Sequence, residues 1–227
     1  MVASTALVRG DDGVRRCAWA TSAPEYVDYH DHEWGRPVVD DRRLFEKLCL
    51  EGFQSGLSWL TILRKRDAFR RAFAGFDVER VARFGARDVE RLMRDAGIVR
   101  NRAKIEATIA NARGTLAVQE ARGSLAALLW SFEPSRRARR APRRFGDVPA
   151  STPESTAMSK ALRSYGFAFV GPTTCYAAMQ SLGIVDDHIV GCSARADVEA
   201  ERAALTRPVS APDAGRPNTA SRRRRGR

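Results

Sequence analysis

The sequence predicts an all-helical fold, and three observations lead to that prediction. Apolar residues recur at spacings of three or four along segments of helical length. Residues that cap helix N-termini stand before several of these segments, and glycines or prolines separate them. The alternation of polar and β-branched residues that marks a strand is missing, so we expect no β-strand.

Length and composition are typical of a globular protein with a substantial core, in one domain or two small ones. The chain has 227 residues, of which 44% are hydrophobic and 29% charged. Near the N-terminus only residues 6–8 form an apolar run, which is too short for a signal peptide. Since no segment reaches the length of a membrane span, we expect a cytoplasmic protein that does not contact a membrane.

Positive charge is concentrated in two arginine-rich segments. The formal net charge is +12, and residues 136–144 contain six arginines while the last six residues contain five more. Such segments attract polyanions through counterion release, or they are simply solvated, and both interpretations stay open.

The charge pattern and the helical periodicity together suggest the domain organisation. We predict a disordered leader over residues 1–15, a helical domain over 16–200 and a disordered basic tail over 201–227. Within the domain, residues 133–150 are expected to form a long exposed loop that carries the first arginine cluster.

The first predicted helix lies within residues 24–35 and is rich in aromatic residues. Tyr26, Tyr29, His30 and Trp34 recur at spacings of three or four, so they share one side of the helix. Such a stripe is typical of a hydrophobic core, and we expect some of its members to be core residues.

A helix with an aspartate cap over residues 40–50 leads into the stretch that organises the chain. Glu51 is predicted to end this helix and Trp59 to begin the next one, while Gly52 and Gly56 allow the backbone to turn and to approach a ligand closely. A carboxylate and an aromatic ring facing one cavity suit a flat cationic ligand such as a modified nucleobase. The alternative is a helix corner with a solvated glutamate and a core tryptophan.

Helical patterns continue through residues 67–73, 77–84 and 86–94. A turn at Gly97 then leads to Asn101, which is predicted to cap a new helix. Exposed amides at such a helix N-terminus suit a phosphate oxygen, whereas the alternative is an ordinary joint without a ligand. The residues that add positive charge at this joint are Arg100, Arg102 and Lys104.

The C-terminal part is also predicted to be helical, over residues 124–132, 152–165 and 171–183. Thr152 stands at the N-cap of the second of these helices, and Pro153 occupies its first turn.

Cysteines and histidines are scarce, so their positions are informative. His188 and Cys192 are four residues apart and would face the same way on a helical turn, while Cys17 and His30 form a looser pair. Two thiolates and two imidazoles make a usual tetrahedral site for structural zinc, whereas the alternative is a set of buried structural side chains. The other two cysteines, which lie in apolar helical patterns and are expected in the core, are Cys49 and Cys175.

Seven separated motifs together resemble the 3-methyladenine DNA glycosylase I family, the helix-hairpin-helix base-excision enzymes of bacteria. They are Cys17-Ala18-Trp19, Tyr26 to Gly35, Leu50-Glu51-Gly52 with Gly56-Leu57-Ser58-Trp59, Asp95-Ala96-Gly97-Ile98, Ser159-Lys160-Ala161-Leu162, Gly166-Phe167 with Phe169-Val170-Gly171, and Asp187-His188 with Val190-Gly191-Cys192. The resemblance implies a two-lobed helical fold with double-stranded DNA in the cleft and a zinc clip joining the N- and C-terminal segments.

The resemblance also implies a role for individual residues. The catalytic residues of the base pocket would be Glu51, Tyr29 and Trp59, with Tyr26 and Trp19 binding the substrate beside them. The zinc ligands would be Cys17, His30, His188 and Cys192. The DNA-binding residues would be Gly97, Val99, Arg100 and Arg102 of the hairpin, and Gln54, Gly56 and Leu57 beside the extruded nucleotide.

The implied activity is hydrolysis of the N-glycosidic bond of 3-methyladenine in alkylated DNA, by a monomer acting on the bacterial nucleoid. Asp186 and Asp187 are candidates for a catalytic aspartate only through their proximity to His188. Two alternatives remain, which are a DNA-binding module without activity and a zinc hydrolase with an open metal position.

Overall fold

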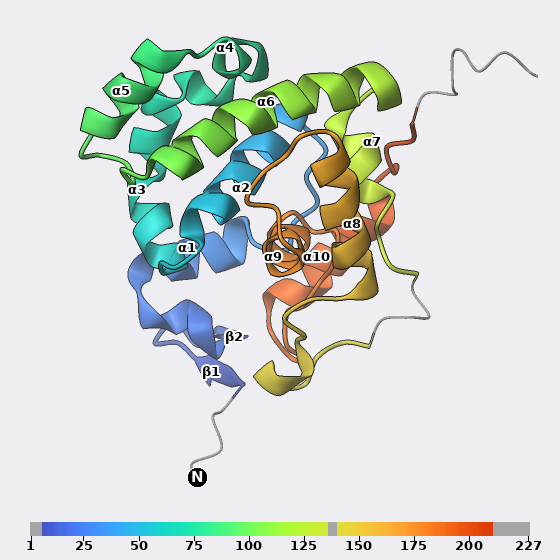
Figure 1. Cartoon of the computed structure of the whole chain (residues 1–227). Helices are drawn as coiled ribbons and strands as arrows, with labels where there is room; N and C mark the ends of the chain where they lie inside the picture. The colour runs from blue at the N-terminus through green and yellow to red at the C-terminus, as the bar shows by residue number, and fades with distance from the viewer. Residues whose placement is uncertain (1–5, 136–139, 211–227) are drawn as a thin grey trace, which may run out of the picture.

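The computed structural model describes residues 6–135 and 140–210. These residues are mostly helical, as predicted (Figure 1). The N-terminal elements are β1 (Leu7–Arg9), β2 (Arg15–Cys17), the short 3₁₀ helix η1 (Ala18–Ser22) and α1 (Pro24–His32). The next elements are α2 (Asp41–Gln54), α3 (Trp59–Ala72), η2 (Ala74–Phe76), α4 (Val78–Ala82), α5 (Ala86–Arg94) and α6 (Arg102–Arg122). The last are α7 (Leu125–Trp130), η4 (Phe145–Asp147), α8 (Pro153–Ser164), α9 (Pro172–Ser181) and α10 (Ala194–Ala204).

Helix α2 is the centre of the structure, because α3, α6, α7 and α9 all pack against it. Its residues Leu44, Phe45 and Leu48 share the inward face and are completely buried in the main hydrophobic cluster. Each such side chain contributes roughly 1.5–3 kcal/mol through removal from water. A polar or charged residue in this helix is therefore held in a fixed place by the core around it.

The N-caps predicted at Asp40, Asn101 and Thr152 are confirmed. These three residues, and Asp77 before α4, each accept a hydrogen bond from the backbone amide three residues later. These contacts satisfy amides that have no partner inside the helix, and each stabilises its helix by about 1 kcal/mol.

Asp41 joins the start of α2 to the start of α7. Its carboxylate accepts hydrogen bonds from the backbone amides of Leu125 and Ala126 and from the side chain of Gln119. A carboxylate at the positive end of a helix is favourable, so this contact fixes two helices relative to each other.

The prediction that the chain contains no strand is wrong, since β1 and β2 form a short antiparallel pair. β1 lies in the predicted leader, and β2 crosses its predicted boundary at residue 15. Leu7 is paired with Cys17, and Gly13 closes the turn with a φ of +77°. Arg16 holds the pair against α1 through ion pairs with Asp12 and Asp31. Three-residue strands are too short to show an alternating pattern, so these tertiary contacts decide their conformation. Residues 1–5 lie outside the described residues.

The predicted boundary of a disordered tail at residue 201 is also too early. Helix α10 continues to Ala204, and Leu205 packs against the main core. Arg207 donates hydrogen bonds to both carboxylate oxygens of Glu133. The segment is ordered by long-range contacts that its local composition does not reveal. Residues 211–227, with the terminal arginines, lie outside the described residues.

In its described residues, the predicted arginine-rich loop at 133–150 contains only the short turn η4. Residues 136–139, which include three of its arginines, lie outside the described part of the chain. Among the described helices, none combines the length and the apolar character that crossing a membrane requires.

Candidate active site and metal cluster

A cavity of about 180 Å³ lies where α1, α2, α3 and α9 meet. Its walls are Trp19, Tyr26, Tyr29, Trp34, Glu51, Gln54, Trp59, Ala177 and Gln180. All five residues that the sequence predicted for a base pocket are in this set. Helix α2 continues to Gln54, so Glu51 lies in its last turn rather than at its end, while Trp59 is the first residue of α3 as predicted.

Glu51 is a buried carboxylate with few partners. It is 6% exposed, and the Ser181 hydroxyl donates a hydrogen bond to its Oε1 atom at 3.3 Å. Burial raises the pKa of Glu51 from its ordinary 4.5 to about 7, against the opposing effects of Lys47 and the Ser181 hydroxyl. The helical core around α2 therefore keeps a buried carboxylate in the wall of an aromatic cavity.

This burial predicts a pH-dependent cost in stability. Because the folded-state pKa is above the unfolded value, the favourable contribution of protonated Glu51 is present below pH 4.5 and is lost as the pH rises through 7. We expect the free energy of unfolding of Glu51→Gln to exceed that of the parent by about 3 kcal/mol at pH 8, and this difference to shrink toward pH 5. Urea denaturation at both pH values measures it. The same difference in stability between variant and parent at both pH values, or a variant less stable than the parent at pH 8, would contradict this account.

Sequence reasoning missed Lys47, which lies one helical turn before Glu51. Its ammonium donates a hydrogen bond to the Tyr29 hydroxyl at 2.9 Å and lies 4.3 Å from the centre of the Trp59 ring. Glu33 is 3.6 Å away, and burial lowers the pKa of the ammonium while Glu51 and Glu33 oppose that effect. The spacing of four between a lysine and a glutamate on one helix was the available signal.

The aromatic walls are fixed by their own contacts. The Tyr26 hydroxyl accepts a hydrogen bond from the backbone amide of Leu60 at 2.8 Å, which joins α1 to the start of α3. The Tyr29 and Trp59 rings lie 5.5 Å apart. These contacts fix the positions of three aromatic walls of the cavity.

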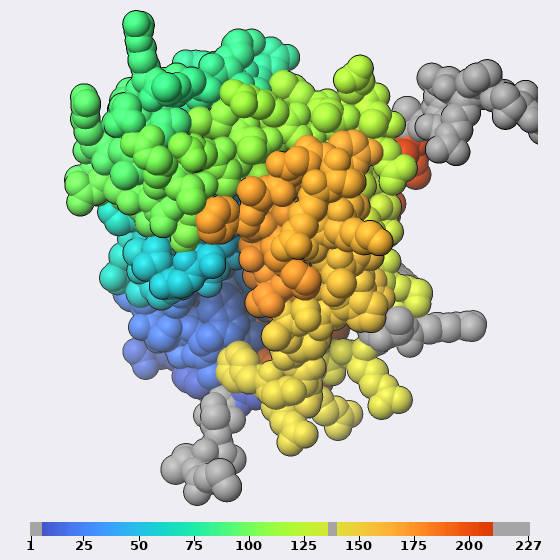
Figure 2. All heavy atoms as spheres, in the orientation of Figure 1, coloured from blue at the N-terminus to red at the C-terminus, as the bar shows by residue number. Residues whose placement is uncertain are grey.

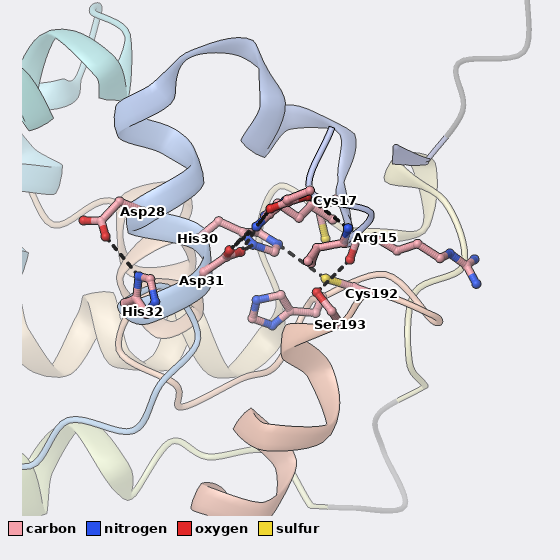
Figure 3. A network of polar contacts seen from close by, with 12 residues as sticks. Arg15, Cys17, Asp28, His30, Asp31, His32, Cys192 and Ser193 are labelled. Atoms are coloured by element: carbon pink, nitrogen blue, oxygen red, sulfur yellow. Dashed lines mark hydrogen bonds and ion pairs between the residues drawn. The ribbon is translucent and has the colours of Figure 1, made fainter. Parts of the chain in front are cut away.

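The predicted metal ligands Cys17, His30 and Cys192 come together from opposite ends of the chain (Figure 3). Their ligand atoms all lie within 4.8 Å of one another, and all three residues are buried. The sulfur of Cys192 is 3.4 Å from Nε2 of His30. The close approach of the two cysteines lowers the pKa of Cys192 and raises that of Cys17, so one thiolate is favoured in the cluster.

His188 reaches this cluster, but not in the way the spacing predicted. Residues 186–193 form no helix, so His188 and Cys192 do not share a helical turn. The His188 and His30 rings nevertheless lie 4.9 Å apart, because the chain turns back at Gly191 and the Cys192 amide donates a hydrogen bond to the Ile189 carbonyl. Nε2 of His188 is buried without a hydrogen-bond partner among the described residues.

Carboxylates orient both histidines. Asp31 contacts Nδ1 of His30 at 2.7 Å, and Asp186 contacts Nδ1 of His188 at 2.8 Å. These contacts leave the Nε2 atoms as the ring positions available to a metal, which is the usual arrangement around metal-binding histidines. Asp186 therefore supports the cluster, whereas Asp187 accepts hydrogen bonds from Tyr176 and Gln180.

The residues present could hold a metal ion. Cys17, His30 and Cys192 converge in a buried place, and the His188 ring lies beside that of His30 with its Nε2 unpartnered among the described residues. Thiols and imidazole nitrogens are ligand types that bind metal ions in proteins.

The metal cluster and the cavity share a wall. Trp19 and Trp34 line the cavity, and their rings lie 5.3 Å from the His30 ring and 4.6 Å from the His188 ring, respectively. Trp19 also packs against Trp34 at 5.2 Å. Any loosening of the cluster therefore moves two walls of the cavity.

The predicted DNA-binding hairpin lies between α5 and α6. Gly97 donates its amide to the Asp95 side chain at 2.8 Å, and Val99 is half-buried in the turn. Arg100 is exposed and has no ion-pair partner in the part of the chain that the structure describes. Arg102 instead pairs with Glu90 at 2.7 Å.

The prediction that Lys104 adds positive charge to the hairpin surface is wrong. Its side chain is buried and donates hydrogen bonds to the carbonyls of Phe53 at 2.9 Å and Ser55 at 2.5 Å. The last turn of α2 and the loop after it attract this ammonium because their carbonyls have no helical partners. Lys104 thus ties the hairpin to the end of α2, where Gln54 lies, and to the following loop with Gly56 and Leu57. In that loop Gly56 has a φ of +80° and Leu57 is 43% exposed.

Comparisons with known proteins show the family of the chain. The family profile described as methyladenine glycosylase matches residues 19–196, most of the chain. The chain belongs to the methyladenine glycosylase family. Among the members of this family, a DNA-3-methyladenine glycosylase of Haemophilus influenzae is 45% identical over 177 residues, which are 78% of this chain and 96% of that protein. DNA-3-methyladenine glycosylase 1 of Escherichia coli is 46% identical over 179 residues, which are 79% of this chain and 96% of that protein.

Solved structures of methyladenine glycosylases have the same fold. A crystal structure of 3-methyladenine DNA glycosylase I superposes with a TM-score of 0.74 at 47% identity, over 78% of this chain and 98% of that one. The enzyme from Staphylococcus aureus, studied for its recognition of 3-methyladenine, superposes with a TM-score of 0.75 at 38% identity, over 79% and 96% of the two chains.

Proposed function

We propose that this protein removes 3-methyladenine from alkylated DNA by hydrolysing the N-glycosidic bond, which releases the base and leaves an abasic site. The observation that carries the proposal is the buried carboxylate of Glu51 in a cavity with the rings of Tyr29 and Trp59. Membership of the methyladenine glycosylase family and the activity named for its relatives support the same function.

The chemistry of the substrate explains why these residues suffice. Methylation at N3 spreads a positive charge over the adenine ring and weakens its glycosidic bond, because the base then departs as a neutral molecule. The carboxylate of Glu51 accepts hydrogen bonds from the adenine edge and stabilises its positive charge. Tyr29 and Trp59 provide faces on which a cationic ring packs favourably. Neutral adenine gains less from the same cavity, and this difference provides selectivity.

We further propose that one structural zinc ion is bound by Cys17, His30, His188 and Cys192. The buried Cys17–His30–Cys192 cluster and the unpartnered Nε2 of His188 support this ligand set. Four protein ligands leave no open position for water, so the alternative of a zinc hydrolase is disfavoured. The ion would join the N-terminal hairpin to the loop before α10 and steady the aromatic wall of the cavity.

The DNA substrate is proposed to be double-stranded and to lie across the hairpin between α5 and α6, bound by a monomer. In a bacterial cell this DNA would be that of the nucleoid, and the protein would act in the cytoplasm. Amides of the hairpin and Arg100 would bind the phosphate backbone, while Gln54, Gly56 and Leu57 would fill the gap left by the extruded nucleotide.

Arg100 provides a test of the DNA interface. Because one phosphate contact accounts for about one unit in the slope of log affinity against log salt, we expect Arg100→Ala to reduce that slope by about one. Arg102→Ala is the matched control and should have a smaller effect, since Arg102 pairs with Glu90. Fluorescence anisotropy with an abasic-site duplex at several salt concentrations measures both slopes. Equal slopes for Arg100→Ala and the unmodified protein would remove Arg100 from the interface.

The direct test of the proposed function is incubation with methylated duplex DNA, followed by chromatography of the released bases. We expect release of 3-methyladenine with little 7-methylguanine. Tight, salt-dependent binding of DNA with no released base would instead favour the alternative of a silent DNA-binding module.

A further inference from the structure

Phe169, in the segment between α8 and α9, combines backbone strain with exposure of its ring. Its φ is +55°, a left-handed conformation that is unfavourable for a residue with a bulky side chain. Two other described non-glycine residues have positive φ, Ala74 and Phe76, and the Phe76 ring is completely buried in the core. The Phe169 ring remains 38% exposed, so burial of the ring does not compensate for the strain.

Helix α6 holds this segment in place. The side chain of Asn111 donates a hydrogen bond to the Ala168 carbonyl at 3.2 Å and accepts one from the Ala168 amide at 2.7 Å. The preceding residue, Phe167, is buried against Gly114, where any side chain would collide with its ring. With residue 167 turned inward and residue 168 clamped, the backbone presents the Phe169 ring at the surface.

The exposed ring lies beside the loop that follows α2. A Cβ atom at Gly52 would lie 3.2 Å from the Cβ of Phe169, so the segment packs directly on the end of α2. The Lys104 ammonium lies 6.0 Å from the centre of the Phe169 ring and also binds the Ser55 carbonyl. Figure 2 shows the orange segment after α8 on the same face as the cyan residues that follow α2, below the green α6. Leu57, two residues after Ser55, is the other large exposed apolar side chain in this region.

We propose that Phe169 is a DNA-contacting residue that stacks on a base next to the extruded nucleotide. This inference rests on the proposed function, because it requires duplex DNA on the face that carries Leu57. An aromatic side chain that stacks on one base typically contributes about 10-fold or more to affinity, and it tolerates any sequence because every base has a π-face. Leu57 would fill the gap on one side and Phe169 would support the neighbouring base, with Asn111 and Lys104 as positioning residues.

The experiment measures binding to a duplex with an abasic-site analogue and 2-aminopurine as its neighbouring base. We expect Phe169→Ala to bind this duplex about 10-fold more weakly and to lose the change in 2-aminopurine emission that stacking causes. Phe169→Tyr keeps the ring and should retain both signals. Phe145→Ala is the matched control, because Phe145 is 39% exposed but lies in η4 of the arginine-rich loop.

Binding of free 3-methyladenine separates a lost DNA contact from damage to the cavity. Phe169→Ala should bind the free base as well as the unmodified protein does, since Phe169 does not line the cavity. Binding of the duplex within twofold of the unmodified protein, or an equal loss in Phe169→Tyr or Phe145→Ala, would overturn the inference. If the unmodified protein itself released no base from methylated DNA, the proposed function would fail, which is a different result.

Discussion

Replacing Glu51 with glutamine is expected to reduce excision of 3-methyladenine by about 100-fold. The amide has nearly the same shape, but it carries no charge and can no longer accept hydrogen bonds with both terminal atoms. A hydrogen bond to a charged group is worth roughly 1.5–3 kcal/mol, and about 3 kcal/mol corresponds to the expected factor. The carboxylate lies in a buried site, where solvent does not screen the lost attraction for a cationic base.

This prediction is measured as the rate of base release from methylated duplex DNA under single-turnover conditions. Glu46→Gln is the matched control, because Glu46 lies on the same helix and pairs with Arg70 away from the cavity. It should excise at the unmodified rate. The Glu51→Gln protein should unfold at the same or a higher temperature, since burial disfavours the ionised carboxylate. Excision at the unmodified rate by Glu51→Gln would show that the carboxylate has no role in the reaction.

The second large effect is expected from Cys192→Ser, which should lose the zinc ion and lower the melting temperature by roughly 10 °C. A structural zinc site contributes several kcal/mol of folding free energy, and each kcal/mol shifts the melting temperature by about 2–4 °C in a chain of this size. The variant should also excise slowly, because Trp19 and Trp34 lie between the cluster and the cavity.

Metal analysis by mass spectrometry, together with a thermal melt, provides the measurement. Cys175→Ser is the control, since Cys175 is equally buried but lies outside the cluster and donates only a weak hydrogen bond to the Val170 carbonyl. We expect one zinc ion per chain in the unmodified protein and in the control. Absence of zinc from the unmodified protein, or one ion per chain in Cys192→Ser, would contradict the proposed ligand set.

Much of the fold could be predicted from local patterns. The caps at Asp40 and Asn101 and the inward face of α2 depend on residues only a few positions apart, so the sequence contains the whole signal. The pocket residues were predictable for a different reason, because the motifs that contain Glu51 and Trp59 resemble those of a known family.

Other parts of the site depend on contacts between distant positions. In the sequence, Lys104 is one of several cationic residues near a hairpin. In the structure its ammonium donates a hydrogen bond to the Phe53 carbonyl, 51 residues away along the chain. His188 and Cys192 were expected to face the same way on a helical turn. They lie in a loop instead, and both contact His30 of α1. In each case local spacing was the wrong measure of distance.

The starts of the helices, the residues that face the core and the family resemblance could be predicted from the chain alone, because these properties depend on near neighbours and shared motifs. The pairing of β1 with β2, the burial of Lys47 beside Trp59 and the exposure of Phe169 are visible only in the folded chain. Burial and ion pairing follow from how the helices pack on α2, and no local pattern encodes that packing.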